Sequence, residues 1–311
     1  MAAPAGVVYA LLADAEKWPL FLSSKIHVER LEFDGERDRL RTWSLMDGRL
    51  TSWTVWRRLD PVERRVEFHQ ELPLCPPDFM AGTMSMRDAG PGDTELLLEY
   101  HLGAGQDRSD AVAWHEQFAD ESSHIQLADL KGCAERWRHL DELVLSFEES
   151  IRVNGPPELV YDFLYRADAW PESVPDIARV DLTEDSPGVQ RMAMETLTER
   201  GPQTTGSIRI CFPHAGRIIH KQTALPALLA AHVGEWSVVP DETGVTVVAQ
   251  HSVVLRDEGI PAVLSDRADL AQARRNVRET LGRRSRALLG RAKEHAESAV
   301  RMLHPAPVHG A

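Results

Sequence analysis

The sequence predicts an α+β protein made of two tandem copies of one domain, each a curved antiparallel sheet around a long C-terminal helix. Two observations predict this fold. Shifting the chain by 152 positions places many residues on identical residues in the other half. Each half also runs from an early helix through several strands to a long helix, an order typical of α+β domains. A sheet wrapped around a helix leaves an internal cavity, which is the natural place for a ligand.

The repeat rests on matches at one fixed offset, without gaps. A repeat this long corresponds to a whole domain, because solenoid repeats are much shorter. A length of 311 residues also suits two ordinary domains. We therefore expect a first domain at residues 1–142, a second at residues 143–304 and a flexible tail at residues 305–311. The matching pairs include Pro4 and Pro156, Tyr9 and Tyr161, Trp18-Pro19 and Trp170-Pro171, Arg57 and Arg209, and Gln70 and Gln222.

The first copy is predicted to open with a helix at residues 5–18 and to close with a long helix at residues 110–140. No strand precedes its first helix, so one sheet edge is expected to lack a neighbour. Either this copy omits or borrows that strand, or the strand precedes the start of the sequence. Alternating apolar residues between turn signals predict the strands between the helices, at residues 26–33, 39–45, 49–59, 65–71, 82–88 and 94–102.

The second copy is the more complete one. A strand at residues 143–153 leads into the turn Asn154-Gly155-Pro156-Pro157, and a proline at the first helical positions favours a helix that ends near Trp170. A long helix at residues 266–302 closes the copy. The predicted strands lie at residues 191–199, 204–211, 217–223, 234–239 and 244–255.

Composition and charge exclude several classes of protein. Hydrophobic residues make up 43% of the chain, and no apolar run approaches the roughly 20 residues that span a bilayer. A net charge of −13 argues against nucleic-acid binding. The cysteines Cys75, Cys133 and Cys211 show no metal or disulfide spacing, which indicates reduced thiols in a cytoplasmic protein. Nucleotide, flavin and serine-hydrolase motifs are absent, so no cofactor is expected.

One segment is strongly basic despite the acidic total. Between Ala271 and Lys293 a single acid, Glu279, stands among many arginines. The segment is either a solvated helix face or a docking surface for an acidic partner. Its basic residues are Arg274, Arg275, Arg278, Arg283, Arg284, Arg286, Arg291 and Lys293.

The strand that carries Arg57 resembles a motif of a known family. The order of elements, with Trp18-Pro19 after the first helix, resembles the helix-grip (START-like, birch-pollen-allergen-like) superfamily. The string from Ser52 to Pro61, SWTVWRRLDP, looks like the strand and turn of its aromatase/cyclase branch, which belongs to bacterial type II polyketide synthases. Single-domain members carry Trp-x-Ser-x-Arg there. Trp53 and Arg57 fit this pattern, whereas Val55 replaces the serine.

In the second copy, Ser207 and Arg209 restore the Ser-x-Arg pair, and Thr205 stands where Trp53 would be. The two-copy layout resembles the di-domain aromatase/cyclases. This resemblance implies an enzyme that closes the first ring of a poly-β-ketone, usually C7–C12, and then dehydrates and aromatises it. It also implies as partner an acyl carrier protein, which holds the polyketide on its phosphopantetheine arm, and it allows other synthase subunits as further partners.

The implied catalytic residues are Arg57, Ser207 and Arg209. An arginine stays protonated and presents several donors, so it suits a ketone oxygen on which charge develops. Period-two alternation puts Trp53, Val55 and Arg57 on one strand face, with Arg58 on the other. The alternation leaves open which face points inward. In the family that the chain resembles, the serine and arginine of this strand face the cavity, and this resemblance makes Trp53, Val55 and Thr205 the predicted substrate-binding residues. In the alternative interpretation Arg57 is a surface arginine paired with an acid, and Ser207 and Arg209 make a cross-strand hydrogen bond or a surface pair.

The sequence leaves open which copy is catalytic, and both are weighted equally. The histidines, among them His220, His232 and His251, show no metal-binding spacing and are interpreted as ordinary packed or solvated side chains, so no metal is expected. Two non-enzymatic functions remain as alternatives. The fold also suits a carrier of lipids or other apolar molecules, and one copy could act as a scaffold for the other.

Overall fold

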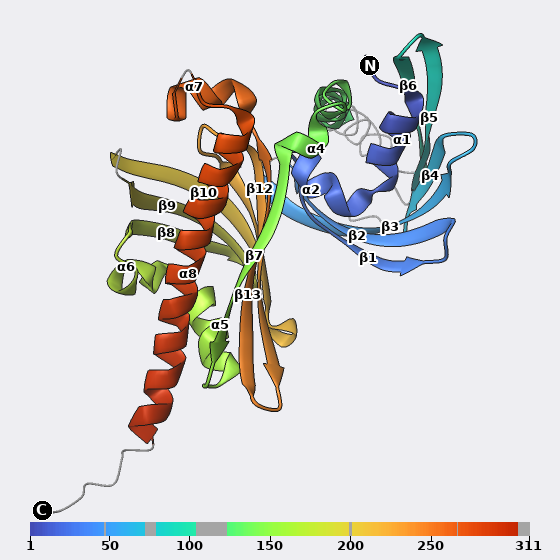
Figure 1. Ribbon diagram of the computed structural model, residues 1–311. Helices are drawn as coiled ribbons and strands as arrows, with labels where there is room; N and C mark the ends of the chain where they lie inside the picture. The colour runs from blue at the N-terminus through green and yellow to red at the C-terminus, as the bar shows by residue number, and fades with distance from the viewer. Residues whose placement is uncertain (47, 72–78, 104–122, 199–200, 266, 304–311) are drawn as a thin grey trace, which may run out of the picture. The chain divides into compact units, whose positions relative to one another are not determined.

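A computed structural model shows two compact units, Met1–Asp141 and Glu142–Ala311, which we call the first and second domains (Figure 1). The structure describes residues 1–46, 48–71, 79–103, 123–198, 201–265 and 267–303. The predicted tail at residues 305–311 and Cys75 lie outside these ranges, whereas Cys133 and Cys211 are free thiols. In the described ranges no helix combines the length and apolar character that a membrane span requires.

The first domain is a six-stranded antiparallel meander with short helices before it. Its sheet has the order β1-β2-β3-β4-β5-β6. Residues 123–135 are helical after the sheet, but a turn at residues 136–139 ends that helix before the predicted residue 140, and residues 110–122 of the prediction lie outside the described part. The elements are α1 (Ala5–Ala13), η1 (Ala15–Lys17), α2 (Trp18–Phe21), β1 (Lys25–Phe33), β2 (Arg37–Met46), β3 (Arg49–Asp60), β4 (Arg65–Gln70), β5 (Phe79–Gly90), β6 (Asp93–Gly103) and α4 (Leu140–Leu143).

The second domain has seven strands in the order β7-β13-β12-β11-β10-β9-β8. The 34-residue helix α8 (Leu270–Leu303) packs on the sheet, and β7 and β13 supply most of that contact. The other elements are β7 (Val144–Val153), α5 (Pro157–Tyr165), η2 (Ala167–Ala169), α6 (Trp170–Ser173), β8 (Ile177–Ser186), β9 (Val189–Thr198), β10 (Gly201–Phe212), η3 (Pro213–Ala215), β11 (Arg217–Ala224), β12 (Leu229–Asp241), β13 (Gly244–Leu255), η4 (Asp257–Gly259) and α7 (Ile260–Val263).

The sequence prediction missed one strand, β8. Its sequence, IARVDLTEDS, carries few apolar residues because β8 is an edge strand, with most of its side chains at least partly exposed. The early helix also differs from the prediction. In both domains it ends before the tryptophan, and a 3-10 turn and a second short helix follow.

The sheet edge predicted to lack a neighbour in the first domain is β6. The first residues of the chain cover part of it. The Met1 ammonium donates to the Thr94 carbonyl at 2.9 Å, and the Thr94 hydroxyl donates to the Ala3 carbonyl at 2.6 Å. In the second domain the full strand β7 pairs with β13 at the corresponding edge.

The core of each domain lies between the concave sheet face and its helices. In the second domain, α8 buries a stripe of small and branched residues, including Ala273, Leu289 and Ala296, at helical spacing. A side chain at Gly155 would meet the Ala296 backbone at 3.0 Å, so this glycine permits the chain to approach the helix closely. In the first domain, Val8 on α1 and Leu40 on β2 are fully buried in one cluster.

Candidate functional site

The two matching arginines both lie on the inner face of their sheet. Arg57 on β3 is 2% exposed and Arg209 on β10 is fully buried, whereas the Arg58 side chain is 49% exposed. The alternation predicted for this strand is therefore confirmed. Val55 belongs to the core of the first domain, and Trp53 packs against that core. Thr205 and Ser207 are 4% and 6% exposed on the inner face of β10.

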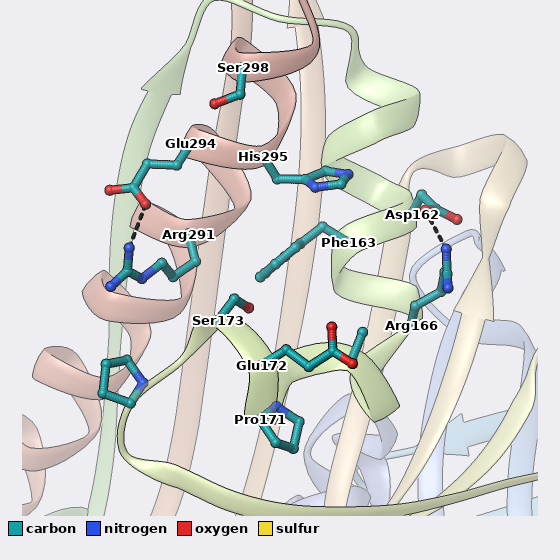
Figure 2. Close-up of a pocket in the computed structure, with 12 residues that line it drawn as sticks. Asp162, Phe163, Arg166, Pro171, Glu172, Ser173, Arg291, Glu294, His295 and Ser298 are labelled. Atoms are coloured by element: carbon teal, nitrogen blue, oxygen red, sulfur yellow. Dashed lines mark hydrogen bonds and ion pairs between the residues drawn. The ribbon is translucent and has the colours of Figure 1, made fainter.

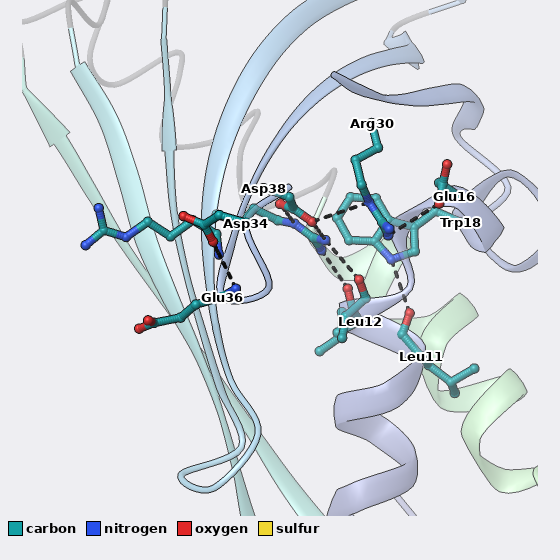
Figure 3. A network of polar contacts seen from close by, with 11 residues as sticks. Leu11, Leu12, Glu16, Trp18, Arg30, Asp34, Glu36 and Asp38 are labelled. Carbon is teal, nitrogen blue, oxygen red and sulfur yellow. Dashed lines mark hydrogen bonds and ion pairs between the residues drawn. The ribbon is translucent and has the colours of Figure 1, made fainter. Parts of the chain in front are cut away.

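Arg57 is held in a closed network of polar contacts, of which Asp38, Leu12 and Trp18 are labelled in Figure 3. Its Nε and Nη2 donate to the two carboxylate oxygens of Asp38 at 2.9 and 2.6 Å. Nη1 and Nη2 donate to the carbonyls of Leu12 and Ala13, at the end of α1, at 2.7 and 2.9 Å. The guanidinium also lies 5.0 Å from the ring centre of Trp18. Arg57 is thus neutralised by a carboxylate and joins α1 to the sheet.

Arg209 makes the same backbone contacts but lacks the carboxylate. Nη1 donates to the Tyr165 carbonyl at 3.2 Å and Nη2 to the Leu164 carbonyl. The cross-strand position that Asp38 holds beside Arg57 is occupied here by Gln190. Within the described ranges no carboxylate forms an ion pair with Arg209, and its Nε has no hydrogen-bond partner. Burial lowers the pKa of this guanidinium from its ordinary value.

Strand register places polar residues in one row across the inner face of the second sheet. Arg209 pairs with His220, His220 with Gly234 and Gly234 with His251. Gly234 has no side chain, and a Cβ there would meet the His220 ring at 2.3 Å, so the imidazole occupies the space above the glycine. We call this series, which starts at Gln190, the second-domain row: Gln190, Arg209, His220, Gly234 and His251.

His232 lies two residues before Gly234 on β12 and joins the row from the same face. Its Nε2 lies 3.0 Å from His251 Nδ1, and His251 Nε2 lies 2.6 Å from the Ser285 hydroxyl on α8. Trp236 stacks on His220 with ring centres 4.3 Å apart. A hydrogen-bonded chain therefore runs from the sheet to the long helix.

Several polar atoms in and beside this row are buried without a hydrogen-bond partner. Buried polar groups in proteins are normally paired, so a cluster of unpaired ones indicates where a ligand with oxygen atoms could bind. The cluster combines donors and acceptors from three adjacent strands. Its atoms are Ser207 Oγ, Arg209 Nε, His220 Nδ1, Gln222 Oε1 and His232 Nδ1.

The three imidazoles are neutral at physiological pH. Burial, aided by the neighbouring histidines, holds the pKa of His220 well below its ordinary value and lowers that of His232 to about 3. Burial lowers the pKa of His251 to about 4. One nitrogen from each ring lies within 4.8 Å of the others. Neutral imidazoles this close could hold a divalent metal ion, or could pass a proton along the bond between His232 and His251.

The sequence prediction did not identify these histidines, because they are widely spaced in the chain and share no motif. The sequence contains one local signal that could have revealed part of this cluster. Strand β11 follows β10 after a tight turn, so Arg209 and His220 could have been recognised as cross-strand neighbours once the turn length was fixed.

A separate pocket of about 660 Å³ opens among the helices of the second domain (Figure 2). Phe163 on α5 and His295 on α8 face each other there, with ring centres 5.6 Å apart. The ion pair between Arg291 and Glu294, with N and O 2.6 Å apart, also lines it. None of the residues in the second-domain row lines this pocket.

Comparison with known proteins identifies the family. The chain is 38% identical to the actinorhodin polyketide synthase bifunctional cyclase/dehydratase of Streptomyces coelicolor, over 93% of this chain and 92% of that protein. It is 35% identical to the granaticin polyketide synthase bifunctional cyclase/dehydratase of Streptomyces violaceoruber, over 96% of this chain and 93% of that protein. The chain belongs to the polyketide synthase bifunctional cyclase/dehydratase family.

Solved structures and a family model agree with this membership. The di-domain ARO/CYC BexL from the BE-7585A biosynthetic pathway shares 38% identity and a TM-score of 0.84, covering 96% of both chains. The di-domain ARO/CYC StfQ from the steffimycin pathway shares 30% identity and a TM-score of 0.82, covering 96% of this chain and 97% of that one. Residues 144–297 match the family described as polyketide cyclase / dehydrase and lipid transport. The cyclase/dehydratase thus has the tandem helix-grip fold and the aromatase/cyclase type of enzyme activity that its sequence implies.

Proposed function

We propose that this enzyme closes the first ring of a poly-β-ketone between C7 and C12, dehydrates it, and performs the ring closure in the second domain. The observation that carries this proposal is Arg209, a fully buried cation with an unpaired Nε beside neutral imidazoles. In the first domain, Asp38 accepts from both Nε and Nη2 of the equivalent Arg57. The Nε donor that is open at Arg209 is therefore occupied at Arg57.

Ring closure needs little chemical activation, because the methylene groups between two ketones enolise easily. The main task is to select which carbons meet, and orientation in a fixed site can lower the barrier by about 7–11 kcal/mol. Arg209 Nε would donate to the ketone oxygen that becomes an alkoxide, an effect worth about 3–4 kcal/mol for one donor. The unpaired Ser207 hydroxyl and Gln222 carbonyl would hold neighbouring oxygens of the chain.

Loss of water then requires one group that accepts a proton from carbon and one that gives a proton to the departing hydroxyl. The His232–His251 pair suits this exchange, because a proton taken up at one ring can pass to the other. The low pKa of both rings makes the protonated form a strong acid, which would release its proton readily. The Ser285 hydroxyl, 2.6 Å from His251 Nε2, orients that ring.

We propose an acyl carrier protein as the partner that delivers the polyketide. Much of the predicted basic segment is internally neutralised, since Arg278 and Arg286 both pair with Glu149 and Arg291 pairs with Glu294. Arg275 and Arg283 are exposed on α8. These two arginines support docking of an acidic carrier protein, and other synthase subunits could share that surface.

The test is product analysis of a minimal polyketide synthase with and without this protein. We expect a regiospecific C7–C12 aromatic product to replace a shunt mixture, and Arg209→Gln to reduce it by about 10²–10³-fold. The matched variant Arg57→Gln leaves the buried Asp38 with only its long contact to Arg30, at 4.0 Å, so it should lower the free energy of unfolding by about 3–5 kcal/mol. Arg57→Gln should affect yield through the amount of folded protein. An unchanged product spectrum with wild-type protein would favour a binding or scaffolding role.

A further inference from the structure

The three buried histidines of the second domain lie close enough to share one ligand. His220, His232 and His251 lie on β11, β12 and β13, three strands that are neighbours in the sheet. Their side chains are buried, at 6%, 3% and 5% exposed. One ring nitrogen from each lies within 4.8 Å of the others. The proposed proton exchange uses only His232 and His251, so the third imidazole has no role in it.

The distances between these rings suit a metal ion. His232 Nε2 and His251 Nδ1 are 3.0 Å apart. A tetrahedral Zn²⁺ site with Zn–N bonds of about 2.0–2.1 Å places its ligand nitrogens about 3.3 Å apart, so these two nitrogens need to separate only slightly. The His220 ring extends over Gly234, where a Cβ would meet its Nε2 at 2.6 Å, and Gly234 pairs across strands with His251. The third imidazole is therefore directed toward the other two.

Contacts around the rings support this role. A histidine that binds a metal usually donates its other ring N–H to an acceptor, which fixes the ring. His251 Nε2 lies 2.6 Å from the Ser285 hydroxyl, and donation there leaves the lone pair on Nδ1, the nitrogen nearest His232. Trp236 stacks on His220 with ring centres 4.3 Å apart. Nδ1 of His220 and Nδ1 of His232 have no hydrogen-bond partner among the described residues, so the rings carry more nitrogen atoms than their hydrogen bonds occupy.

The first domain shows that the fold does not require imidazoles at these positions. Its inner-face Gly82 pairs with Phe68 on one side and Tyr100 on the other, as Gly234 pairs with two of the histidines. Met80 lies two residues before Gly82, where the second domain has the remaining histidine. Phenylalanine, methionine and tyrosine thus fill in one domain the three positions that histidines fill in the other. Packing alone does not account for the imidazoles.

We propose that His220, His232 and His251 together bind one divalent transition-metal ion, such as Zn²⁺. Imidazole nitrogens suit this class of ion, and three protein ligands leave the fourth tetrahedral position for water or a ligand oxygen. Arg209 pairs across strands with His220, and its positive charge opposes the ion, so the site binds more weakly than one without the arginine. The ion replaces the hydrogen bond between His232 and His251, so an occupied site does not pass a proton between them; this consequence rests on the proposed function.

A Co²⁺ titration of the untagged full chain tests the site without turnover. Co²⁺ absorbs visible light strongly in a tetrahedral site and weakly in an octahedral one, and we expect one tetrahedral Co²⁺ per chain, displaced by Zn²⁺. His220→Phe copies Phe68 of the first domain and should weaken binding by at least about 100-fold, because losing even an outer hydrogen-bond partner of a ligand costs about 10–100-fold. His214→Asn, at an exposed histidine of η3, is the matched control and should bind as the wild type does.

Two further variants separate this site from the surface and from a lost fold. Arg209→Gln removes the opposing charge and should tighten Co²⁺ binding by about 10-fold, whereas a surface site would not respond. His232→Met copies Met80 and removes a second ligand, and melting temperatures measured without metal identify the folded variants. Only weak octahedral absorption with the wild type, or unchanged binding by folded His220→Phe or His232→Met, would overturn the proposal. The proposed ring closure is measured separately, by products formed in the presence of a chelator.

Discussion

The two domains share one scaffold but carry different side chains at corresponding positions. At corresponding positions of the two inner faces, the first sheet carries an ion pair and two aromatic rings, and the second carries an unpaired arginine and two imidazoles. The cross-strand pairing in each sheet shows which residues of the two domains correspond. The first-domain row is Asp38, Arg57, Phe68, Gly82 and Tyr100, and the second-domain row is Gln190, Arg209, His220, Gly234 and His251.

The shared glycine shows what the fold itself requires. A Cβ at Gly82 would meet the Phe68 ring at 2.5 Å, as one at Gly234 would meet His220 at 2.3 Å. The last ring in each row also bonds a serine of the following helix. The Tyr100 hydroxyl lies 2.9 Å from Ser123 Oγ, and His251 Nε2 lies 2.6 Å from Ser285 Oγ. Both rows thus hold flat rings at corresponding positions, carbon rings in the first domain and imidazoles in the second.

The largest effect on product formation is expected when the last residue of the second-domain row is replaced by the tyrosine found at the end of the first-domain row. His251→Tyr should keep a hydrogen bond to Ser285, as Tyr100 does to Ser123, but should interrupt proton transfer with His232. We expect dehydrated product to fall by about 10²–10⁴-fold, with cyclised but undehydrated product accumulating. Mass analysis of the products measures both species.

Tyr100→Phe is the matched control for that exchange. It removes the equivalent hydrogen bond in the first domain and should leave the dehydration rate of the folded enzyme unchanged. Equal loss of dehydration in both variants would show that the two rows contribute alike, contrary to the comparison.

A smaller effect on product formation is expected when the second-domain row receives a carboxylate like that of the first-domain row. Gln190→Asp places an acid beside Arg209, in the position that Asp38 holds beside Arg57. The new pair should occupy Arg209 Nε and reduce the cyclisation rate by about 10–100-fold, the value of a charge-assisted contact. Gln190→Glu, with a longer side chain, tests the geometry. A Gln190→Asp enzyme of full activity would contradict a role for the unpaired donor.

The smallest effect is a difference in acid stability between the domains. The pKa of His251 is about 4 in the folded protein, below the ordinary value of 6.5. The unfolded chain therefore binds this proton first as pH falls below 6.5, and folding stability decreases until about pH 4. Between pH 7 and pH 5 the second domain should lose about 2 kcal/mol through this one histidine. Calorimetry at the two pH values measures the total loss, to which the buried His220 and His232 also contribute, and His251→Tyr should remove the share of His251.

The sequence by itself determined the duplication, the α+β class and which side chains share a strand face with Arg57 and Arg209, but it left open which face points inward. Repeats and period-two alternation are properties of neighbouring residues, so they can be recognised without a structure. The weakly apolar edge strand β8 escaped this kind of reasoning, because its side chains hardly alternate.

Only the tertiary structure decided which groups meet. Asp38 and Gln190 lie 19 residues before their arginines, and nothing local distinguishes a carboxylate that closes an ion pair from an amide that leaves one open. His220, His232 and His251 come from three strands, and Lys25 reaches Trp53 across two strand pairings. These contacts depend on turn lengths and sheet register, which accumulate over many residues, and the site chemistry depends on the contacts.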